Sequence, residues 1–160
     1  MKREAPRAYV DTSVFGGIVD DEFKVVSHRF FDAIGHGAFK LVVSDVVRRE
    51  LVESPIAVRE LFDQMLGDAD VAAVTAEALR LRQAYIAAGI VTRRWMDDAL
   101  HVALASVHHC AMIVSWNFKH IVHFEKIPRY NAVNALNGYS SIFIYSPLEL
   151  VGYADRNKDV

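Results

Sequence analysis

Cysteine is almost absent from this chain, because Cys110 is the only one among its 160 residues. A single cysteine excludes an internal disulfide bond and a zinc site made of cysteines alone, and it suits a reducing compartment. We interpret Cys110 as a small buried hydrophobic residue.

Long apolar segments are missing as well. No uninterrupted apolar stretch approaches the length of about 18 residues that is typical of a membrane-spanning helix. The charged residues 1–7 are not followed by the apolar region of a signal peptide. We therefore expect a cytoplasmic protein that does not contact membranes.

A surplus of positive charge is the third absence. The chain has 18 lysine and arginine residues against 20 aspartate and glutamate residues, which gives a net charge of -2. This balance argues against nonspecific binding of nucleic acid over the whole surface, so any contact with RNA must be local. The hydrophobic share of 52% and the charged share of 24% indicate one globular domain over residues 1–160.

What the sequence does contain is an alternation of short apolar runs with amphipathic segments. Most of the runs are too uniformly apolar to alternate residue by residue, which is typical of strands buried on both faces. The alternation predicts an α/β fold, with a mainly parallel sheet of about five strands covered by helices on both faces. The expected strands are 7–11, 40–44, 70–74, 111–115 and 141–145, and the expected helices include 22–34, 54–66, 75–89 and 98–107.

Several helix ends are marked in the sequence. Ser54 is expected to be an N-cap, with Pro55 in the first helical position. Thr75 is expected to cap the next helix, which Gly89 ends in a left-handed conformation. Ser146 begins a capping-box pattern that opens a short last helix.

Three acidic residues stand near places where strands are expected to give way to helices. Asp11 follows the first strand, Glu50 lies about one turn into the helix after the second, and Asp98 lies in the first turn of its helix. Ligands of open α/β sheets bind beyond the carboxyl ends of the strands, so these carboxylates can converge. Converging carboxylates indicate a hard divalent cation.

Each acidic residue also has an interpretation without chemistry. Asp11 can be an N-cap, and an isolated helical glutamate such as Glu50 faces solvent by default. Asp97 can cap the helix that Asp98 also opens. Capping accounts for only one of the pair, and the adjacent carboxylate needs another purpose, such as the pairing of Asp97 with His101 four residues on.

The segment after the fourth expected strand contains further candidates. Asn117 can offer its carbonyl oxygen to a hard cation, although asparagine is also common in turns. Trp116 and Phe118 can stack on an unpaired base; we expect Phe118 to pack in the core, and the role of Trp116 stays open. For four histidines we favour structural roles over a zinc site, because no cysteine pair and no zincin-type glutamate accompanies them. They are His108, His109, His120 and His123.

Four motifs occur along the chain in a characteristic order. They are Tyr9-Val-Asp-Thr-Ser13, the pattern Ser-Asp-x-x-x-x-Glu-Leu around Glu50, Asp98-Ala-Leu-His-x-Ala-x-Ala105 and Ile113-Val-Ser-Trp-Asn-Phe-Lys-His120. This combination resembles PIN-domain proteins of the VapC-like toxin group. The resemblance extends to Tyr130-Asn-Ala-Val-Asn134 and covers most of the chain.

The resemblance implies a three-layer α/β/α sandwich in which acidic residues gather around Mg²⁺ or Mn²⁺. Such proteins cleave RNA as metal-dependent endoribonucleases, are commonly blocked by a cognate antitoxin protein, and often form homodimers. By position, Asp11, Glu50 and Asp98 match the acidic residues of the family. Asn117 stands where many members have aspartate.

Roles for these residues follow from their ligand chemistry. Asp11 and Asp98 are expected to bind the metal, and Glu50 either binds it through water or orients the attacking water. Asn117 completes the expected catalytic set.

Contacts with the substrate are expected from neighbouring side chains. Thr12 and Ser13 can bind phosphate or the waters of the metal, although a local turn hydrogen bond is favoured for each. Phosphate contacts in a slightly acidic protein must come from local cations. The candidates are Arg49 and Lys119, followed by Arg48, Arg93 and Arg94.

Two other functions remain open. A degenerate PIN-like module that binds RNA or a protein partner without cleavage would account for Asn117. An aspartate-dependent phosphatase would use Asp11 as its nucleophile, but the second downstream aspartate typical of haloacid-dehalogenase-like enzymes is missing.

Overall fold

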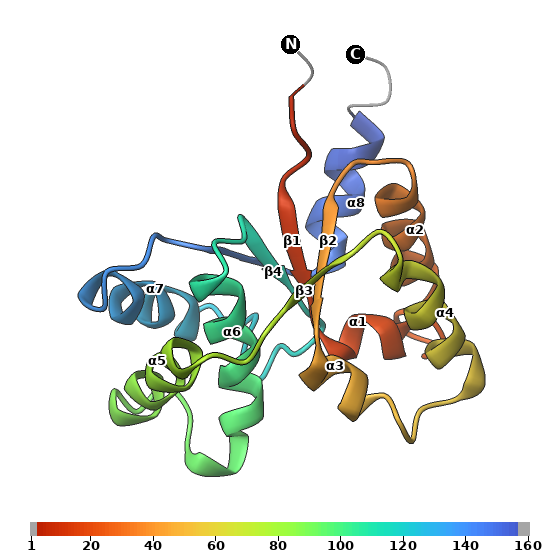
Figure 1. Cartoon of the computed structure of the whole chain (residues 1–160). Helices are drawn as coiled ribbons and strands as arrows, with labels where there is room; N and C mark the ends of the chain where they lie inside the picture. Colours follow the sequence, from red (N-terminus) through yellow and green to blue (C-terminus); the bar gives the residue numbers. More distant parts are fainter. Residues whose placement is uncertain (1–2, 157–160) are drawn as a thin grey trace.

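One parallel sheet forms the centre of the computed structural model, which describes residues 3–156 (Figure 1). Its strands lie in the order β3-β2-β1-β4-β5, and every neighbouring pair is parallel. All five runs predicted as strands are strands, so the predicted sheet is confirmed. Their bounds are β1 (Arg7–Val10), β2 (Lys40–Ser44), β3 (Asp70–Ala72), β4 (Met112–Val114) and β5 (Phe143–Tyr145).

Helices cover both faces of this sheet, as Figure 1 shows, and the predicted three-layer α/β/α sandwich is confirmed. One layer contains α1 (Thr12–Gly17), α2 (Lys24–Gly35), α4 (Ile56–Leu66) and α8 (Pro147–Arg156). The other contains α5 (Ala76–Ala87), α6 (Met96–Val107) and α7 (Lys126–Leu136). The short helix α3 (Asp45–Glu50) directly follows β2. The single turn of 3₁₀ helix η1 (Arg93–Trp95) directly precedes α6.

The predicted helix ends are partly confirmed. Oγ1 of Thr75 accepts a hydrogen bond from the backbone N of Ala78 at 3.2 Å, and Gly89 has φ +75° just after α5. The prediction that Ser54 caps α4 is wrong. Pro55 itself occupies the N-cap position with ψ 151°, an extended conformation, so that the helix begins one residue later than expected. Ser146 donates a side-chain hydrogen bond to Glu149 at the start of α8.

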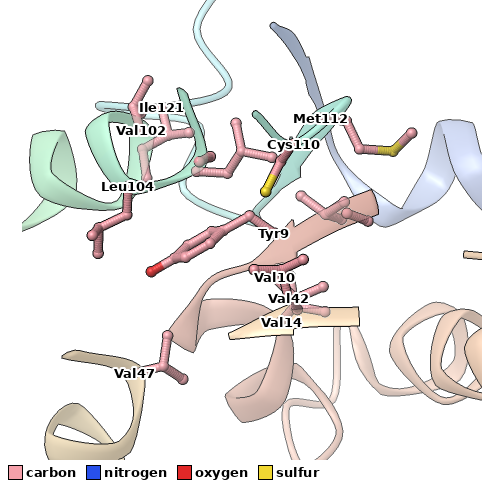
Figure 2. Close-up of a cluster of buried hydrophobic side chains, with 14 of the residues drawn as sticks. Tyr9, Val10, Val14, Val42, Val47, Val102, Leu104, Cys110, Met112 and Ile121 are labelled. Carbon is pink, nitrogen blue, oxygen red and sulfur yellow. The ribbon is translucent and has the colours of Figure 1, made fainter. Parts of the chain in front are cut away.

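The core surrounds the central strand, whose residues are buried on both faces as predicted. Tyr9 and Val10 are fully buried there, and Figure 2 shows them among aliphatic side chains of β2 and α6. Cys110 belongs to the same cluster and is 7% exposed. Burial raises the pKa of its thiol to about 11, which agrees with its interpretation as a buried hydrophobic residue.

The order of the strands creates a switch point between β1 and β4. The chain builds β1, β2 and β3 outward in one direction and then crosses back to place β4 and β5 on the other side of β1. Connections after β1 and β4 therefore diverge to opposite layers, and side chains at their carboxyl ends border an open crevice. Asp11 follows β1 and Ser115 follows β4 at this place.

No helix within residues 3–156 has the length and apolar character needed to cross a lipid bilayer.

Candidate functional site

Asp11 is the N-cap that the sequence allows, and it stands at the end of the central strand, as predicted. It is the N-cap of α1, where Oδ1 accepts hydrogen bonds from the backbone N of Ser13 at 3.1 Å and from Oγ of Ser13 at 2.6 Å. It is also 3% exposed at the carboxyl end of the central strand. Burial raises the pKa of Asp11 more than the charge of His101 and the serine hydrogen bonds lower it.

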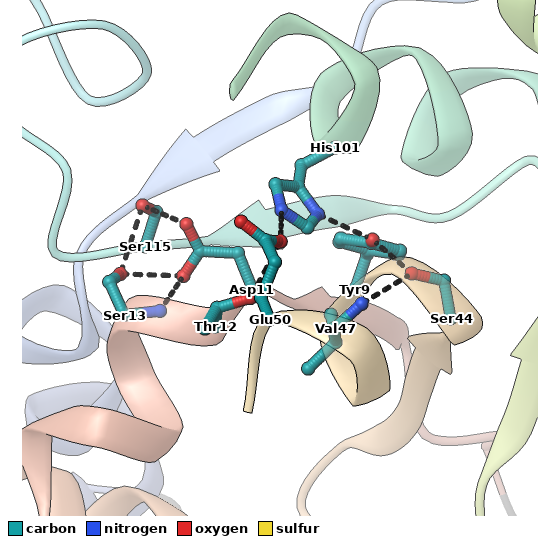
Figure 3. A network of polar contacts seen from close by, with 9 residues as sticks. All are labelled: Tyr9, Asp11, Thr12, Ser13, Ser44, Val47, Glu50, His101 and Ser115. Atoms are coloured by element: carbon teal, nitrogen blue, oxygen red, sulfur yellow. Dashed lines mark hydrogen bonds and ion pairs between the residues drawn. The ribbon is translucent and has the colours of Figure 1, made fainter. Parts of the chain in front are cut away.

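Ser115 joins β4 to Asp11 and was missed in the sequence. Its Oγ donates to Oδ2 of Asp11 at 2.6 Å (Figure 3). The same oxygen also accepts from the backbone N of Asn117 at 2.9 Å. The register that pairs Val10 with Val114 places the two following residues side by side. Ser115 stands directly after a buried strand, as Asp11 does, and this position is the signal that could have identified it.

Glu50 is exposed to solvent in part, as expected by default, but its carboxylate also accepts hydrogen bonds from α1 and α6. Its Oε1 accepts hydrogen bonds from Oγ1 of Thr12 at 2.9 Å and from Nε2 of His101 at 2.6 Å. Its side chain is 35% exposed. Burial alone would raise the pKa of Glu50, but the hydrogen bond and charge of His101, with smaller effects of Thr12 and Arg49, lower it. Glu50 is therefore a carboxylate at neutral pH.

Asp98 is half-buried in the first turn of α6 and faces the same site. Its carboxylate hydrogen-bonds the side chain of Asn117 and lies within electrostatic range of Glu50, His101 and His120. Burial raises its pKa, with a further increase from the charge of Glu50, and these effects outweigh the hydrogen bond from Asn117. The ionised form of Asp98 is thus disfavoured by its surroundings.

Asn117 combines a turn role with a place in the site. Its Oδ1 accepts from the backbone N of His120 at 2.9 Å and of Lys119 at 3.2 Å, while its amide group contacts Asp98. Because Oδ1 holds the loop, the NH₂ group is the one that faces Asp98 and donates to it. An aspartate at position 117 could not donate in this way.

His101 is the second residue that sequence reasoning misplaced. Both of its ring nitrogens have partners, Nε2 with Glu50 and Nδ1 with the hydroxyl of Tyr9 at 2.7 Å. The suggested pairing of His101 with Asp97 is therefore wrong, and Asp97 is exposed. His101 lies three residues after Asp98 on the same helix, which places both side chains on the face that meets the site.

The aromatic residues beside Asn117 differ in burial, and Trp116, whose role was left open, is the buried one. Trp116 is 6% exposed, stacks on Phe23 with centroids 4.2 Å apart, and donates from Nε1 to Ser27. Phe118 is 46% exposed, so the prediction that it packs in the core is wrong. The ring of Trp116 already fills the space between α1 and α2, which leaves Phe118 outside.

The candidate substrate residues divide into two kinds. Ser13 makes the local hydrogen bond that was favoured from the sequence, to Asp11, whereas Thr12 donates to Glu50, 38 residues away, instead of making a local turn bond. Two of the cations are exposed and border the site: the charge of Arg49 acts on Glu50, and Lys119 follows directly on the Asn117 turn. Lys119 Nζ also lies 5.9 Å from the ring centroid of Trp95.

The other predicted cations lie elsewhere. Arg48 pairs with Asp45 at 3.9 Å and stands over the ring of Phe62, away from the carboxylates. Arg93 and Arg94 are exposed on η1, and the guanidinium of Arg94 lies 4.8 Å from the centroid of Trp95. The same indole stacks with His120 at a centroid distance of 4.5 Å.

The donor set of the site suits a hard cation. Asp11, Glu50, Asp98 and Asn117 offer carboxylate and amide oxygens, which Mg²⁺ and Mn²⁺ prefer. Within residues 3–156, no three His, Cys, Asp or Glu side chains form a group that could hold a metal ion by themselves. A complete protein cage is not required, because magnesium normally keeps several waters and uses one or two carboxylates together with substrate phosphate.

Comparison with solved structures finds the same arrangement of elements in another protein. A chain in the crystal structure of VapBC2 from Rickettsia felis bound to a DNA fragment from their promoter matches with a TM-score of 0.57. The match covers 87% of this chain and 97% of that chain at 13% sequence identity, so it is a likeness of fold. No protein-family model and no curated protein matches the chain. The PIN-like fold predicted from the motifs is confirmed.

Proposed function

We propose that this chain, whose fold is that of PIN-domain proteins, is a metal-dependent endoribonuclease and the toxin of a toxin–antitoxin pair. One observation carries the proposal. Asp11, Glu50 and Asp98 come from three distant parts of the sequence, and Asp11 and Asp98 each lie within electrostatic range of Glu50 and His101. Burial raises the pKa of two of them, Asp11 and Asp98. A divalent cation would relieve this unfavourable concentration of negative charge.

In this proposal Asp11, Asp98 and Glu50 hold Mg²⁺ or Mn²⁺. When bound there, the ion would supply an activated water and charge stabilisation for the phosphodiester. Ser13 and Ser115 fix the carboxylate of Asp11, and the amide of Asn117 orients Asp98. Glu50 either reaches the ion through water or orients the attacking water.

The partners of the chain belong to the proposal as well. RNA is the proposed substrate because the carboxylate site suits phosphodiester chemistry and has cations at its border. A cognate antitoxin is proposed because the matched chain belongs to VapBC2, which was crystallised with promoter DNA. The homodimer and the cytoplasmic location stay predictions from the sequence.

The test is cleavage of a mixed pool of structured RNA by protein purified free of any partner. We expect cutting with Mn²⁺ or Mg²⁺ and none when EDTA is present in excess. A parallel reaction with a small phosphomonoester should give no product, which separates the nuclease from a phosphatase. Intact RNA in the presence of folded, Mn²⁺-bound protein would contradict the nuclease and favour a module that binds without cleavage.

Lys119 is expected to contribute one phosphate contact. Replacing it with alanine should weaken binding of an unpaired RNA oligonucleotide and lower the slope of log affinity against log salt by about 0.7 to 1. Fluorescence anisotropy in EDTA between about 50 and 200 mM salt measures both quantities. Lys40 provides the matched control, because it stands at the amino end of β2, whereas the carboxylates lie beyond the carboxyl ends of the strands. An equal loss for Lys40→Ala and Lys119→Ala would contradict the assigned place of the RNA.

A further inference from the structure

A buried chain of hydrogen bonds leads from the sheet to Glu50 (Figure 3). The hydroxyl of Tyr9 contacts Oγ of Ser44 at 2.8 Å and Nδ1 of His101 at 2.7 Å. From there Nε2 of His101 donates to Oε1 of Glu50 at 2.6 Å. Tyr9 and His101 are 0% and 2% exposed, so that bulk water cannot substitute for these contacts. The chain connects β1, β2, α6 and α3.

Glu50 has little else to hold it. It is the last residue of α3, where the helix dipole disfavours a carboxylate, and its side chain is 35% exposed. A long, partly exposed side chain in such a position would otherwise sample several rotamers. Thr12 provides a second hydrogen bond, from the first residue of α1.

Both donors reach the same oxygen of Glu50. Thr12 and His101 occupy Oε1, and no hydrogen bond within residues 3–156 uses Oε2. The carboxylate is thereby held through one oxygen, while Oε2 makes no hydrogen bond to the described part of the chain and Glu50 lies within electrostatic range of Asp98. If Glu50 served only to pair with the buried His101 ring, its second oxygen, Oε2, would have no role. We take its availability as the feature that links Glu50 to the metal site.

We propose that His101 is a positioning residue that holds Glu50 with its free oxygen available to the metal ion or its water. Tyr9 and Ser44 in turn fix the orientation of the imidazole ring. His101 itself touches neither metal nor RNA. This inference rests on the proposed function, because it assigns Glu50 its place in the same site.

Two substitutions of His101 separate positioning from packing. A glutamine side chain can place its NH₂ group near the position of Nε2 and keep the hydrogen bond to Glu50. An asparagine side chain reaches only the position of Nδ1, so it can contact Tyr9 but not Glu50. Both replacements exchange the buried imidazole ring for an amide. If His101 served only the packing of the core, the two variants should therefore change Mn²⁺ binding to a similar degree.

The first readout is the dissociation constant of Mn²⁺ alone, followed by electron paramagnetic resonance. We expect His101→Asn to weaken Mn²⁺ binding by about 10- to 100-fold, the usual effect of losing a partner that orients a metal ligand. His101→Gln should stay several-fold closer to the wild type. In cleavage assays His101→Asn should lower kcat with little change in the KM for RNA, because His101 does not contact the substrate.

Tyr9→Phe keeps the experiment decisive if the His101 variants fold poorly. It removes one hydroxyl while the ring remains, and it should weaken Mn²⁺ binding measurably. Tyr85→Phe is the matched control. The hydroxyl of Tyr85 is also buried and hydrogen-bonded, but to Asn134 and Ser106 outside the site. This control should lower stability to a similar degree and leave Mn²⁺ binding unchanged.

The outcomes separate the inference from the proposal beneath it. If the wild type neither binds Mn²⁺ nor cleaves RNA, the proposed function fails and the inference fails with it. If the wild type does both, equal Mn²⁺ affinities for the Asn and Gln variants overturn only the positioning role. Equal effects of Tyr9→Phe and Tyr85→Phe on Mn²⁺ binding would overturn it in the same way.

Discussion

Asp98→Asn is expected to lower the rate of Mn²⁺-dependent RNA cleavage by more than about 100-fold. Losing a residue that only orients a metal ligand costs about 10- to 100-fold, and Asp98 is a proposed ligand itself. Asp97→Asn is the matched control, because Asp97 precedes Asp98 in the same helical turn but is exposed. Its rate should stay within about two-fold of the wild type. Similar losses for both variants would remove Asp98 from the site.

The same variant is expected to be more stable than the wild type at pH 7. Burial raises the pKa of Asp98 in the folded protein. A group with a raised pKa contributes its full stability below its unfolded pKa of about 3.9, and this contribution is lost as the pH rises through the folded pKa. At pH 7 the wild type bears the cost of an ionised Asp98, whereas asparagine is neutral at every pH.

Thermal unfolding without metal, from pH 4 to pH 7, measures this effect. The melting temperature of Asp98→Asn should exceed that of the wild type at pH 7, and the difference should shrink towards pH 4. Added Mn²⁺ should raise the melting temperature of the wild type and reverse the order at neutral pH. A variant that is less stable than the wild type at pH 7 would show that Asp98 serves the fold rather than a ligand.

Phe15→Ala is expected to lower the free energy of unfolding by about 3 to 5 kcal/mol, the usual range for a buried phenylalanine. Phe15 is 0% exposed in α1, and its ring meets Phe31 of α2 at 4.8 Å and Phe62 of α4 at 5.3 Å between centroids. A domain of this kind has a total stability of about 5 to 15 kcal/mol, so the loss is a large share. Because α1 begins beside Asp11, the packing of Phe15 also anchors the site.

Urea unfolding of Phe15→Ala and of Phe124→Ala tests this prediction, because the two variants make the same chemical change at a buried and at an exposed position. Phe124 is 85% exposed and should change the free energy of unfolding by less than about 0.5 kcal/mol. A cost below about 1 kcal/mol for Phe15→Ala would mean that α1 does not depend on this contact.

The strands and most of the longer helices could be read from the sequence because their signals are local. A run such as Lys40–Ser44 is buried on both faces, so hydrophobicity alone identifies it. Thr75 and Gly89 mark their helix ends through their own backbone and side-chain chemistry. The helices α1 and α7 were not predicted. The first has six residues, too few for a periodic pattern, and the stripe of the second is interrupted by polar residues such as Asn131 and Asn134.

Sequence motifs also brought Asp11, Glu50, Asp98 and Asn117 to attention, because acidic and amide residues after strands are visible without coordinates. The partners of these residues were not visible. His101 was assigned to Asp97, its neighbour in sequence, whereas the fold gives it Glu50 from a helix 51 residues away. The place of Phe118 was mispredicted for a similar reason, since Trp116, whose role was left open, is the ring that packs beside Ser27.

The sequence by itself determined the class of fold and the residue types of the site. Local hydrophobic periodicity, capping chemistry and the position of carboxylates after strands do not depend on distant contacts. Only the tertiary structure decided how those carboxylates are held, because the order β3-β2-β1-β4-β5 brings Ser115 beside Asp11 and α6 beside α3. Hydrogen-bond partners across 51 or 104 residues follow from this packing, and no local pattern encodes them.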